Sequence, residues 1–226
     1  MNTRLHYRLK SNNDHMIISF QGLRGYAILL IFISHCNINF ADKENIFKYL
    51  WALGVSIFIM LSGYLAIYNM ENKKNEFHLF KVLKRKLQKF YPLHILTLFL
   101  AIPLHYKELF VNPSPIAYGA LGANVLLVQA WVPWESVYFA YNAVSWYLSL
   151  TLFLVIATPF IVTLIKKLNV RLLCGSAIAV FAFMVIWCGL LQKTLYAHWL
   201  IYILPLIRCL DFFLGGGNAY LRKKAV

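Results

Sequence analysis

The chain has 226 residues, of which 61% are hydrophobic, and its mean hydropathy is +0.63. A water-soluble domain of this length could not bury so much apolar surface, so the composition excludes that class and indicates a membrane protein with several spans. The formal net charge is +14. Many basic residues cluster between positions 73 and 89, and most others flank apolar runs, which fits the positive-inside rule and argues against a nucleic-acid partner.

Seven apolar segments follow one another along the chain, and we expect all of them to be helices because open strands cannot satisfy their backbone in lipid. They cover residues 17–36, 49–69, 90–106, 115–132, 144–165, 172–191 and 197–219. The predicted fold class is therefore all-α, a polytopic integral membrane helix bundle. No linker marks a second domain, so residues 1–226 are interpreted as one domain.

The first segment contains two ionisable residues, Arg24 and His35, with ten residues between them. Eleven helical steps return to nearly the same face, about 16 Å further along the axis. Ionisable groups within a bilayer are costly and tend to mark a function. The alternative is an arginine that extends its charge to the interface and a histidine satisfied by a neighbouring helix. Arg24 also interrupts the apolar run, so we expect a retained anchor and not a cleaved signal peptide.

The distribution of basic residues predicts the topology. Arg4, Arg8 and Lys10 place the N-terminus in the cytoplasm, and the basic stretch at 73–89 places the second loop there too. Within that stretch, apolar residues from Phe77 to Phe90 alternate with lysines, which predicts a basic amphipathic segment leading into the third span. Seven full crossings would leave later lysines outside. We therefore expect six crossings, with segment 115–132 re-entrant or partly inserted, in a multi-pass protein of the cytoplasmic membrane.

Five short motifs occur in one order along the chain. The pair Arg24 and His35 is followed by a Gly-Val…Leu-Ser-Gly-Tyr run at 53–65, by a Lys-x-x-Lys-Phe-Tyr-Pro run at 86–92, by Asn-x-x-Ser-Trp-Tyr-Leu-Ser at 142–149, and by Arg-x-x-Asp-Phe-x-x-Gly at 208–215. Together they resemble the motifs of the membrane-bound acyltransferase family 3. The resemblance covers residues 24–215, and none of the motifs would suffice alone.

The resemblance implies transfer of an acyl group, usually acetyl, from coenzyme A to a hydroxyl of a cell-envelope glycan or lipid-linked sugar. No cofactor is expected to stay bound, and acyl-CoA is the donor substrate. The chain departs from the family at Thr151, where many members have a glutamate, and at Lys86 and Lys89, which replace two arginines. Its seven apolar segments also correspond to about two-thirds of a family domain, so we expect a chain that is incomplete at its C-terminus, with uncertain activity.

Roles for particular residues follow from this resemblance. His35 is the expected general base, because a sugar hydroxyl is a weak nucleophile, and Arg24 is its partner in the motif. Lys86 and Lys89 are expected to bind the donor phosphates, or else to be ordinary inner-face anchors. A lower-ranked set of candidates along the substrate path comprises Ser62, Trp146, Arg208 and Asp211.

The lower-ranked candidates each have a structural alternative. Ser62 with Gly63 more often permits close helix packing, and Trp146 is equally explained as an interfacial tryptophan. Arg208 and Asp211, three residues apart on a helix, are best interpreted as a structural pair. The four cysteines lack the spacing of a metal site, so no metal is expected.

Two other functions remain open on the sequence alone. A transporter or flippase of envelope precursors would also be polytopic, basic on its inner side and furnished with intramembrane charges. A truncated, non-catalytic remnant of the acyltransferase would keep the same motifs. Consumption of acyl-CoA separates the enzyme from both.

Overall fold

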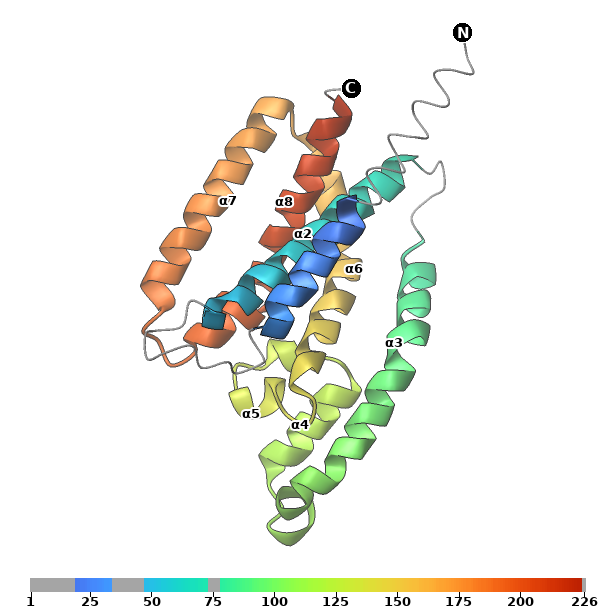
Figure 1. Ribbon diagram of the computed structural model, residues 1–226, viewed down its shortest axis with the longest axis vertical. Helices are drawn as coiled ribbons and strands as arrows, with labels where there is room; N and C mark the ends of the chain where they lie inside the picture. Colours follow the sequence, from blue (N-terminus) through green and yellow to red (C-terminus); the bar gives the residue numbers. More distant parts are fainter. Residues whose placement is uncertain (1–18, 34–46, 73–77, 225–226) are drawn as a thin grey trace. The chain divides into compact units, whose positions relative to one another are not determined.

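The computed structural model describes residues 19–33, 47–72 and 78–224, and the regular secondary structure within these ranges is helical (Figure 1). The α-helices are Ser19–Ile33, α2 (Phe47–Asn72), α3 (Leu79–Ala101), α4 (Pro115–Val125), α5 (Glu135–Tyr138), α6 (Trp146–Lys167), α7 (Val170–Leu191) and α8 (Pro205–Lys224). Short 3₁₀ or π-helical turns connect several of them, at Ile102–His105, Lys107–Val111, Gln129–Trp131, Ala143–Ser145 and Trp199–Ile203.

The chain divides into two compact units, Met1–Ser62 and Gly63–Val226, and the boundary falls inside α2. In the first unit, Ser19–Ile33 packs closely against the beginning of α2 at Gly54. A Cβ atom at Gly54 would lie 2.8 Å from the carbonyl oxygen of Ala27 and 2.7 Å from Cγ1 of Ile31. Glycine is therefore needed here because it lets two helix backbones approach one another, as is common between membrane helices.

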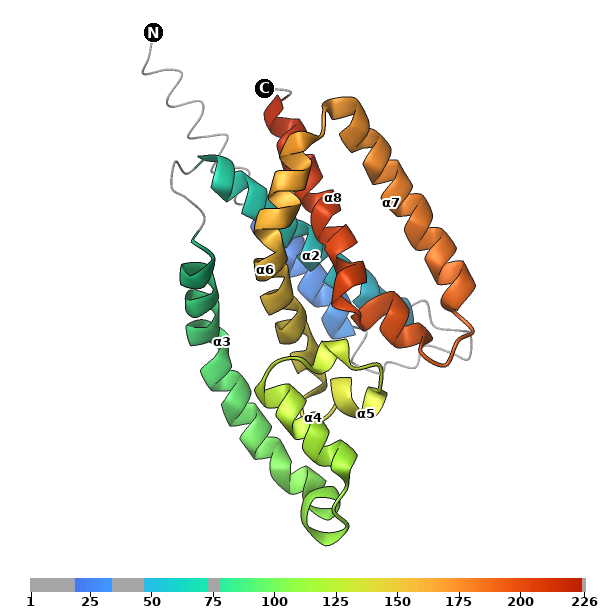
Figure 2. The ribbon, with the colours of Figure 1, turned by 180° about the vertical axis from the view of Figure 1, so that it is seen from behind.

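In the second unit, α8 is the most buried of the long helices and lies against α6 and the last turns of α2 (Figure 2). Glycines permit this packing as well. A Cβ at Gly63 would overlap the carbonyl of Phe212, and one at Gly216 would lie 3.0 Å from side-chain atoms of both Ile165 and Ile67. These glycines thus allow three helices to pack closely. In lipid, helix association is driven by such packing and not by burial of apolar surface.

Helix α7 stands at the edge of the second unit in both views (Figures 1 and 2). Among its described side chains only Leu173 is buried, and large apolar residues such as Ile178 and Phe181 are exposed. A helix that is apolar on all sides yet barely covered by protein is what a lipid environment requires. Its surface therefore fits contact with acyl chains.

Five of the described helices are long and apolar enough to cross a membrane, and together with the all-helical fold they confirm the prediction of a polytopic helix bundle. Helix α4 has 11 residues, about 16 Å at 1.5 Å per residue, which is too short for a hydrocarbon core of about 30 Å. The chain then turns at Leu127, whose φ is 55°. Segment 115–132 is thus a short helix and a 3₁₀ turn, as a partly inserted segment would be; the number of crossings stays a prediction.

Basic residues gather at one end of the second unit, where α6 and α8 end and α7 begins, with the first half of α3 directed toward it (Figure 1). The basic stretch that precedes the third apolar segment is continuous with it, since α3 starts at Leu79. The described basic side chains at this end, or on the half of α3 directed toward it, are Lys81, Lys84, Arg85, Lys86, Lys89, Lys166, Lys167, Arg171, Arg222, Lys223 and Lys224, whereas those toward the opposite end are Lys107, Lys193 and the buried Arg208.

Candidate active site

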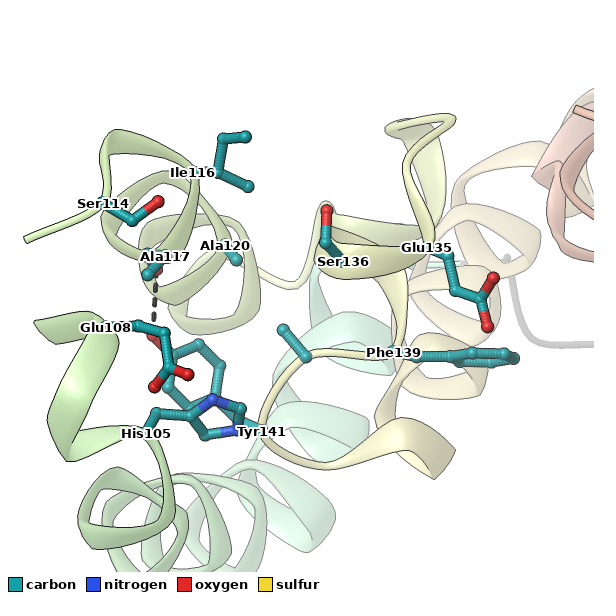
Figure 3. A pocket seen from close by; sticks show the side chains of 11 residues that line it. His105, Glu108, Ser114, Ile116, Ala117, Ala120, Glu135, Ser136, Phe139 and Tyr141 are labelled. Carbon is teal, nitrogen blue, oxygen red and sulfur yellow. Dashed lines mark hydrogen bonds between the residues drawn. The ribbon is translucent and has the colours of Figure 1, made fainter. Parts of the chain in front are cut away.

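A cleft of about 470 Å³ opens in the second unit, at the end opposite the basic residues. It lies between the turns that follow α3 and the short helices α4 and α5. Figure 3 shows that the side chains of His105, Glu108 and Tyr141 lie together on one side, with Glu135 next to Phe139 on the other. The lining residues are His105, Glu108, Ser114, Ile116, Ala117, Ala120, Glu135, Ser136, Phe139, Ala140 and Tyr141.

Proline and irregular turns shape this cleft. Pro103 and Pro115 occupy early positions in helical turns, where a missing N–H costs nothing. Tyr141 has a φ of 60°, which is strained for a residue with a bulky side chain. Its hydroxyl donates to the carbonyl of Ala117 at 2.9 Å, and its ring lies 4.5 Å from that of His105. Several contacts therefore hold Tyr141 in place, and strain of this kind is concentrated at functional sites.

The ionisation of Tyr141 reflects its surroundings. Burial raises the pKa of its phenol, and the carboxylate of Glu108 raises it further. Both effects disfavour the phenolate, so the hydroxyl remains a hydrogen-bond donor at neutral pH.

Beside the cleft, buried polar side chains connect α4 to the beginning of α6. The side-chain amide of Asn124 donates to the carbonyl of Ala120 at 2.9 Å, and its Oδ1 accepts from the hydroxyl of Ser145 at 3.0 Å. The hydroxyl of Ser145 accepts in turn from Nε2 of Gln129 at 3.1 Å. These four residues are buried, so the network is removed from solvent and each bond in it is strengthened by the low dielectric.

His94 joins this network from α3 and is 2% exposed. Its Nε2 lies 2.9 Å from the backbone carbonyl of Asn124. A carbonyl only accepts, so Nε2 of His94 carries a proton and donates this hydrogen bond. Among the described residues, Nδ1 of His94, Oε1 of Gln129 and the hydroxyl of Ser149 are buried without a hydrogen-bond partner. Unsatisfied groups of this kind are rare in a protein interior and call for a water or ligand partner.

Arg208 and Asp211 form a buried ion pair near the beginning of α8. The guanidinium is 4% exposed and the carboxylate 1%, and Nη1 lies 2.7 Å from Oδ2. Nε donates to the carbonyl of Tyr202 at 2.7 Å, and Nη2 to that of Ile201 at 3.1 Å. Pro205 has no N–H to offer the carbonyl of Ile201 four residues earlier. Arg208 thus satisfies a carbonyl left free by the proline, while Asp211 balances its charge.

Trp146 is the first residue of α6 and connects this ion pair to an aromatic cluster. Its ring lies 5.1 Å from that of Tyr202, which also contacts the guanidinium of Arg208 at 4.6 Å. On the other side Tyr202 stacks on His198, whose Nδ1 lies 3.1 Å from the hydroxyl of Tyr138. The structure therefore brings three predicted residues, Trp146, Arg208 and Asp211, into one buried group.

The histidine and tyrosine of this cluster have shifted ionisation. Burial lowers the pKa of His198, and the nearby carboxylate of Glu135 opposes part of that shift. Burial, with a further contribution from Glu135, raises the pKa of Tyr138 to about 12. Both shifts favour the neutral forms of the two side chains at physiological pH.

The other predicted residues are not part of this group. Lys86 is half-buried and Lys89 exposed on the first half of α3, toward the basic end. Arg24 is exposed on Ser19–Ile33, and His35 lies outside the described residues. The hydroxyl of Ser62 donates to the carbonyl of Phe58 in its own helix at 2.8 Å.

Several polar residues of the site were not singled out from the sequence, among them His94, Asn124, Gln129 and the residues that line the cleft. A signal for them was present: His94, Asn124 and Gln129 interrupt segments that are otherwise apolar. Polar groups within membrane segments are expensive and tend to have a partner or a function. The cleft itself gave no such signal, because it depends on how three turns distant in sequence come together.

These features define a polytopic membrane protein with polar and charged groups buried within its helix bundle. Residues 17–225 match the model of the acyltransferase 3 family, described as an acyltransferase domain, and the chain belongs to this family. The resemblance of the five motifs is thereby confirmed.

A curated relative agrees with the family. The chain is 28% identical over 231 residues to the acyltransferase MdmB of Streptomyces mycarofaciens, and the match covers 92% of this chain and 58% of MdmB. The chain thus spans less than two-thirds of the length of this relative. No solved structure matches it significantly.

Proposed function

We propose that the protein is a membrane-embedded O-acyltransferase, which moves an acyl group, in the first instance acetyl, from coenzyme A to a hydroxyl of a cell-envelope glycan or lipid-linked sugar. Family membership supports acyl transfer. The observation that carries the proposal further is the charge distribution of the second unit. Basic residues gather at one end, and a cleft lined by carboxylates, hydroxyls and aromatic rings opens at the other. A donor with several phosphates and an acceptor rich in hydroxyls need opposite surfaces of this kind.

The basic end is the proposed donor side. The first half of α3 carries Lys81, Lys84, Arg85, Lys86 and Lys89 within three turns. Ammonium and guanidinium groups form strong, charge-assisted hydrogen bonds with phosphate. By the positive-inside rule this end faces the cytoplasm, where coenzyme A thioesters are found, and the N-terminus is on the same side of a cytoplasmic membrane.

The proposed chemistry is attack of the acceptor hydroxyl on the carbonyl carbon of the thioester. His35 accepts the hydroxyl proton as a general base, a C–O bond forms, the C–S bond breaks and the thiolate of coenzyme A leaves. Arg24, exposed on the described part of the same apolar segment, offers a fixed positive charge to an anionic part of the donor.

Labelled acetyl-CoA, supplied to the protein in proteoliposomes with a soluble glycan acceptor, tests the donor assignment. Changing both Lys86→Gln and Lys89→Gln should raise the KM for acetyl-CoA at least fivefold, with little change in the KM for the acceptor, because phosphate contacts are lost. The matched control is Lys166→Gln with Lys167→Gln, which removes the same charge from the same end of the bundle.

Equal effects of the two double variants would mean that Lys86 and Lys89 are only inner-face anchors. If the protein moves glycan across the membrane without consuming acetyl-CoA, the enzyme assignment is wrong and a transporter is favoured.

A further inference from the structure

We propose that the cleft binds a sugar unit that has no negative charge, and binds most tightly one with a free amine. This inference rests on the proposed function, because it takes the sugar to be the acyl acceptor. It adds a binding site and a charge preference to that function. The residues of this site are contributed by α4, by α5 and the turn that follows it, and by the turns after α3.

The cleft is lined by acidic residues, although the protein as a whole is strongly basic. The chain has 22 lysines and arginines against 8 acidic residues, yet Glu108 and Glu135 both line this cleft. Among the described residues neither carboxylate forms an ion pair, whereas Asp211 is neutralised by Arg208. None of the described lining residues is a lysine or arginine. The cleft is therefore a site of negative potential in a strongly basic protein, and it would repel a carboxylate, sulfate or phosphate.

The size of the cleft and the polarity of its lining suit a small ligand with many hydroxyls. A volume of about 470 Å³ is within the range of small-molecule sites. The ionised carboxylates of Glu108 and Glu135 only accept hydrogen bonds, so they suit hydroxyl and ammonium donors. The hydroxyls of Ser114 and Ser136 both donate and accept. A ligand with many hydroxyls matches this set of partners.

The aromatic rings complete the match. Phe139 lies beside Glu135, while Tyr141 lies beside Glu108 and His105 (Figure 3). Each side of the cleft thus combines an aromatic ring with a carboxylate. A sugar ring offers both kinds of contact. The C–H groups on its faces pack against aromatic rings, and the hydroxyls at its rim donate hydrogen bonds to carboxylates. Because the hydroxyl of Tyr141 is bound to Ala117, its ring is fixed before a ligand enters.

Binding of three tetrasaccharides to the purified full chain, measured by calorimetry, tests the proposal. The cationic probe is the tetramer of β-1,4-linked glucosamine, and the neutral probe is its N-acetylated form. The anionic probe is the tetramer of galacturonate. The cationic probe should bind at least tenfold more tightly than the anionic one, with the neutral probe between them. Glu108→Gln with Glu135→Gln should reduce this ratio at least fivefold.

Two further variants test whether the charge preference and the binding belong to this cleft. Lys193→Gln changes the charge by one unit toward the same end but outside the cleft, and it should leave the ratio unchanged. Ser136→Trp places a large side chain at an exposed lining position and should weaken binding of the cationic and neutral probes alike. Ser136→Trp also tests the location should the double variant fail to fold.

The inference is overturned if the anionic probe binds as well as the cationic one, or if Ser136→Trp leaves sugar binding intact. Acetyl-CoA consumption, measured separately, distinguishes this failure from failure of the proposed function. If acetyl-CoA is consumed but the double variant keeps the charge preference, the cleft is not the sugar site and the enzyme assignment stands. Charge-selective sugar binding without consumption would keep the cleft as a sugar site and refute the enzyme.

Discussion

Arg208 shows how a single residue can be costly in lipid and still be structural. Its guanidinium has an acidic partner, two backbone carbonyls and the face of Tyr202 around it. Taking one charge of such a pair away leaves the other buried without compensation, which is more harmful than losing both. Arg208 and Asp211 are thus better explained by the helical hydrogen bonding that Pro205 interrupts than by contact with a substrate.

Arg208→Met should therefore destabilise the protein by about 3–5 kcal/mol, because Asp211 is left as a buried, unpaired carboxylate. Thermal unfolding in detergent measures this loss. Arg222→Gln is the control, since Arg222 is exposed and donates to the hydroxyl of Tyr64 at 3.2 Å, and it should change the midpoint little. An Arg208→Met protein as stable as the wild type would favour a role in substrate binding instead.

His198 gives the stability a dependence on pH. Its pKa is lowered in the folded protein, chiefly by burial, so the unfolded chain binds the proton more readily. The stability that neutral His198 contributes is complete above its unfolded pKa of about 6.5 and is lost as the pH falls through that value and toward the folded pKa. His198→Gln should flatten the curve of unfolding midpoint against pH between about 5 and 7. An unchanged slope would contradict the shift.

Helix packing depends on where glycine is placed. Gly63 lies against the carbonyl of Phe212, whereas a Cβ added at Gly119 in α4 would have nothing within 4 Å. Helix α2 can approach α8 this closely only because position 63 has no side chain. The Ser-Gly pair at 62–63 therefore acts in packing through its glycine, while Ser62 bonds within its own helix.

Gly63→Ala should cost about 1–3 kcal/mol, because the added methyl forces two helices apart. Gly119→Ala is the matched control and should be neutral or slightly stabilising, since alanine favours a helix and nothing obstructs its methyl. Both are measured by thermal unfolding in the same detergent. Equal midpoints for the two variants would show that α2 and α8 are not in close contact.

Most helices could be predicted from the sequence because length and hydropathy decide whether a segment can lie in lipid. Segment 144–165, for example, corresponds to α6 within two residues at each end. The last predicted segment, 197–219, differs more, because a π-helical turn at Trp199–Ile203 and Pro205 delay the start of α8. The unusual φ of Tyr141 and the cleft around it could not be predicted, since they arise from tertiary contacts that no local pattern encodes.

At the scale of the molecule, the distribution of charge is the feature that connects fold to function. Most described basic residues of the second unit gather toward one end, and two of its carboxylates line a cleft at the other. The sequence predicted the basic end, since charge runs next to apolar segments are visible directly. It did not predict the cleft, because Glu108 and Glu135 are 27 positions apart in the sequence numbering and line one cleft only through the turns between α3 and α5.

The most direct test of the central claim is acyl transfer from labelled acetyl-CoA by membranes that contain either the wild-type chain or His35→Ala. The account predicts that wild-type membranes consume acetyl-CoA and label a glycan, and that His35→Ala abolishes the transfer while expression and membrane insertion are unchanged. Transfer at the wild-type rate by His35→Ala would contradict the assignment of the base. Failure of the wild-type membranes to consume acetyl-CoA would contradict the proposal of an active acyltransferase.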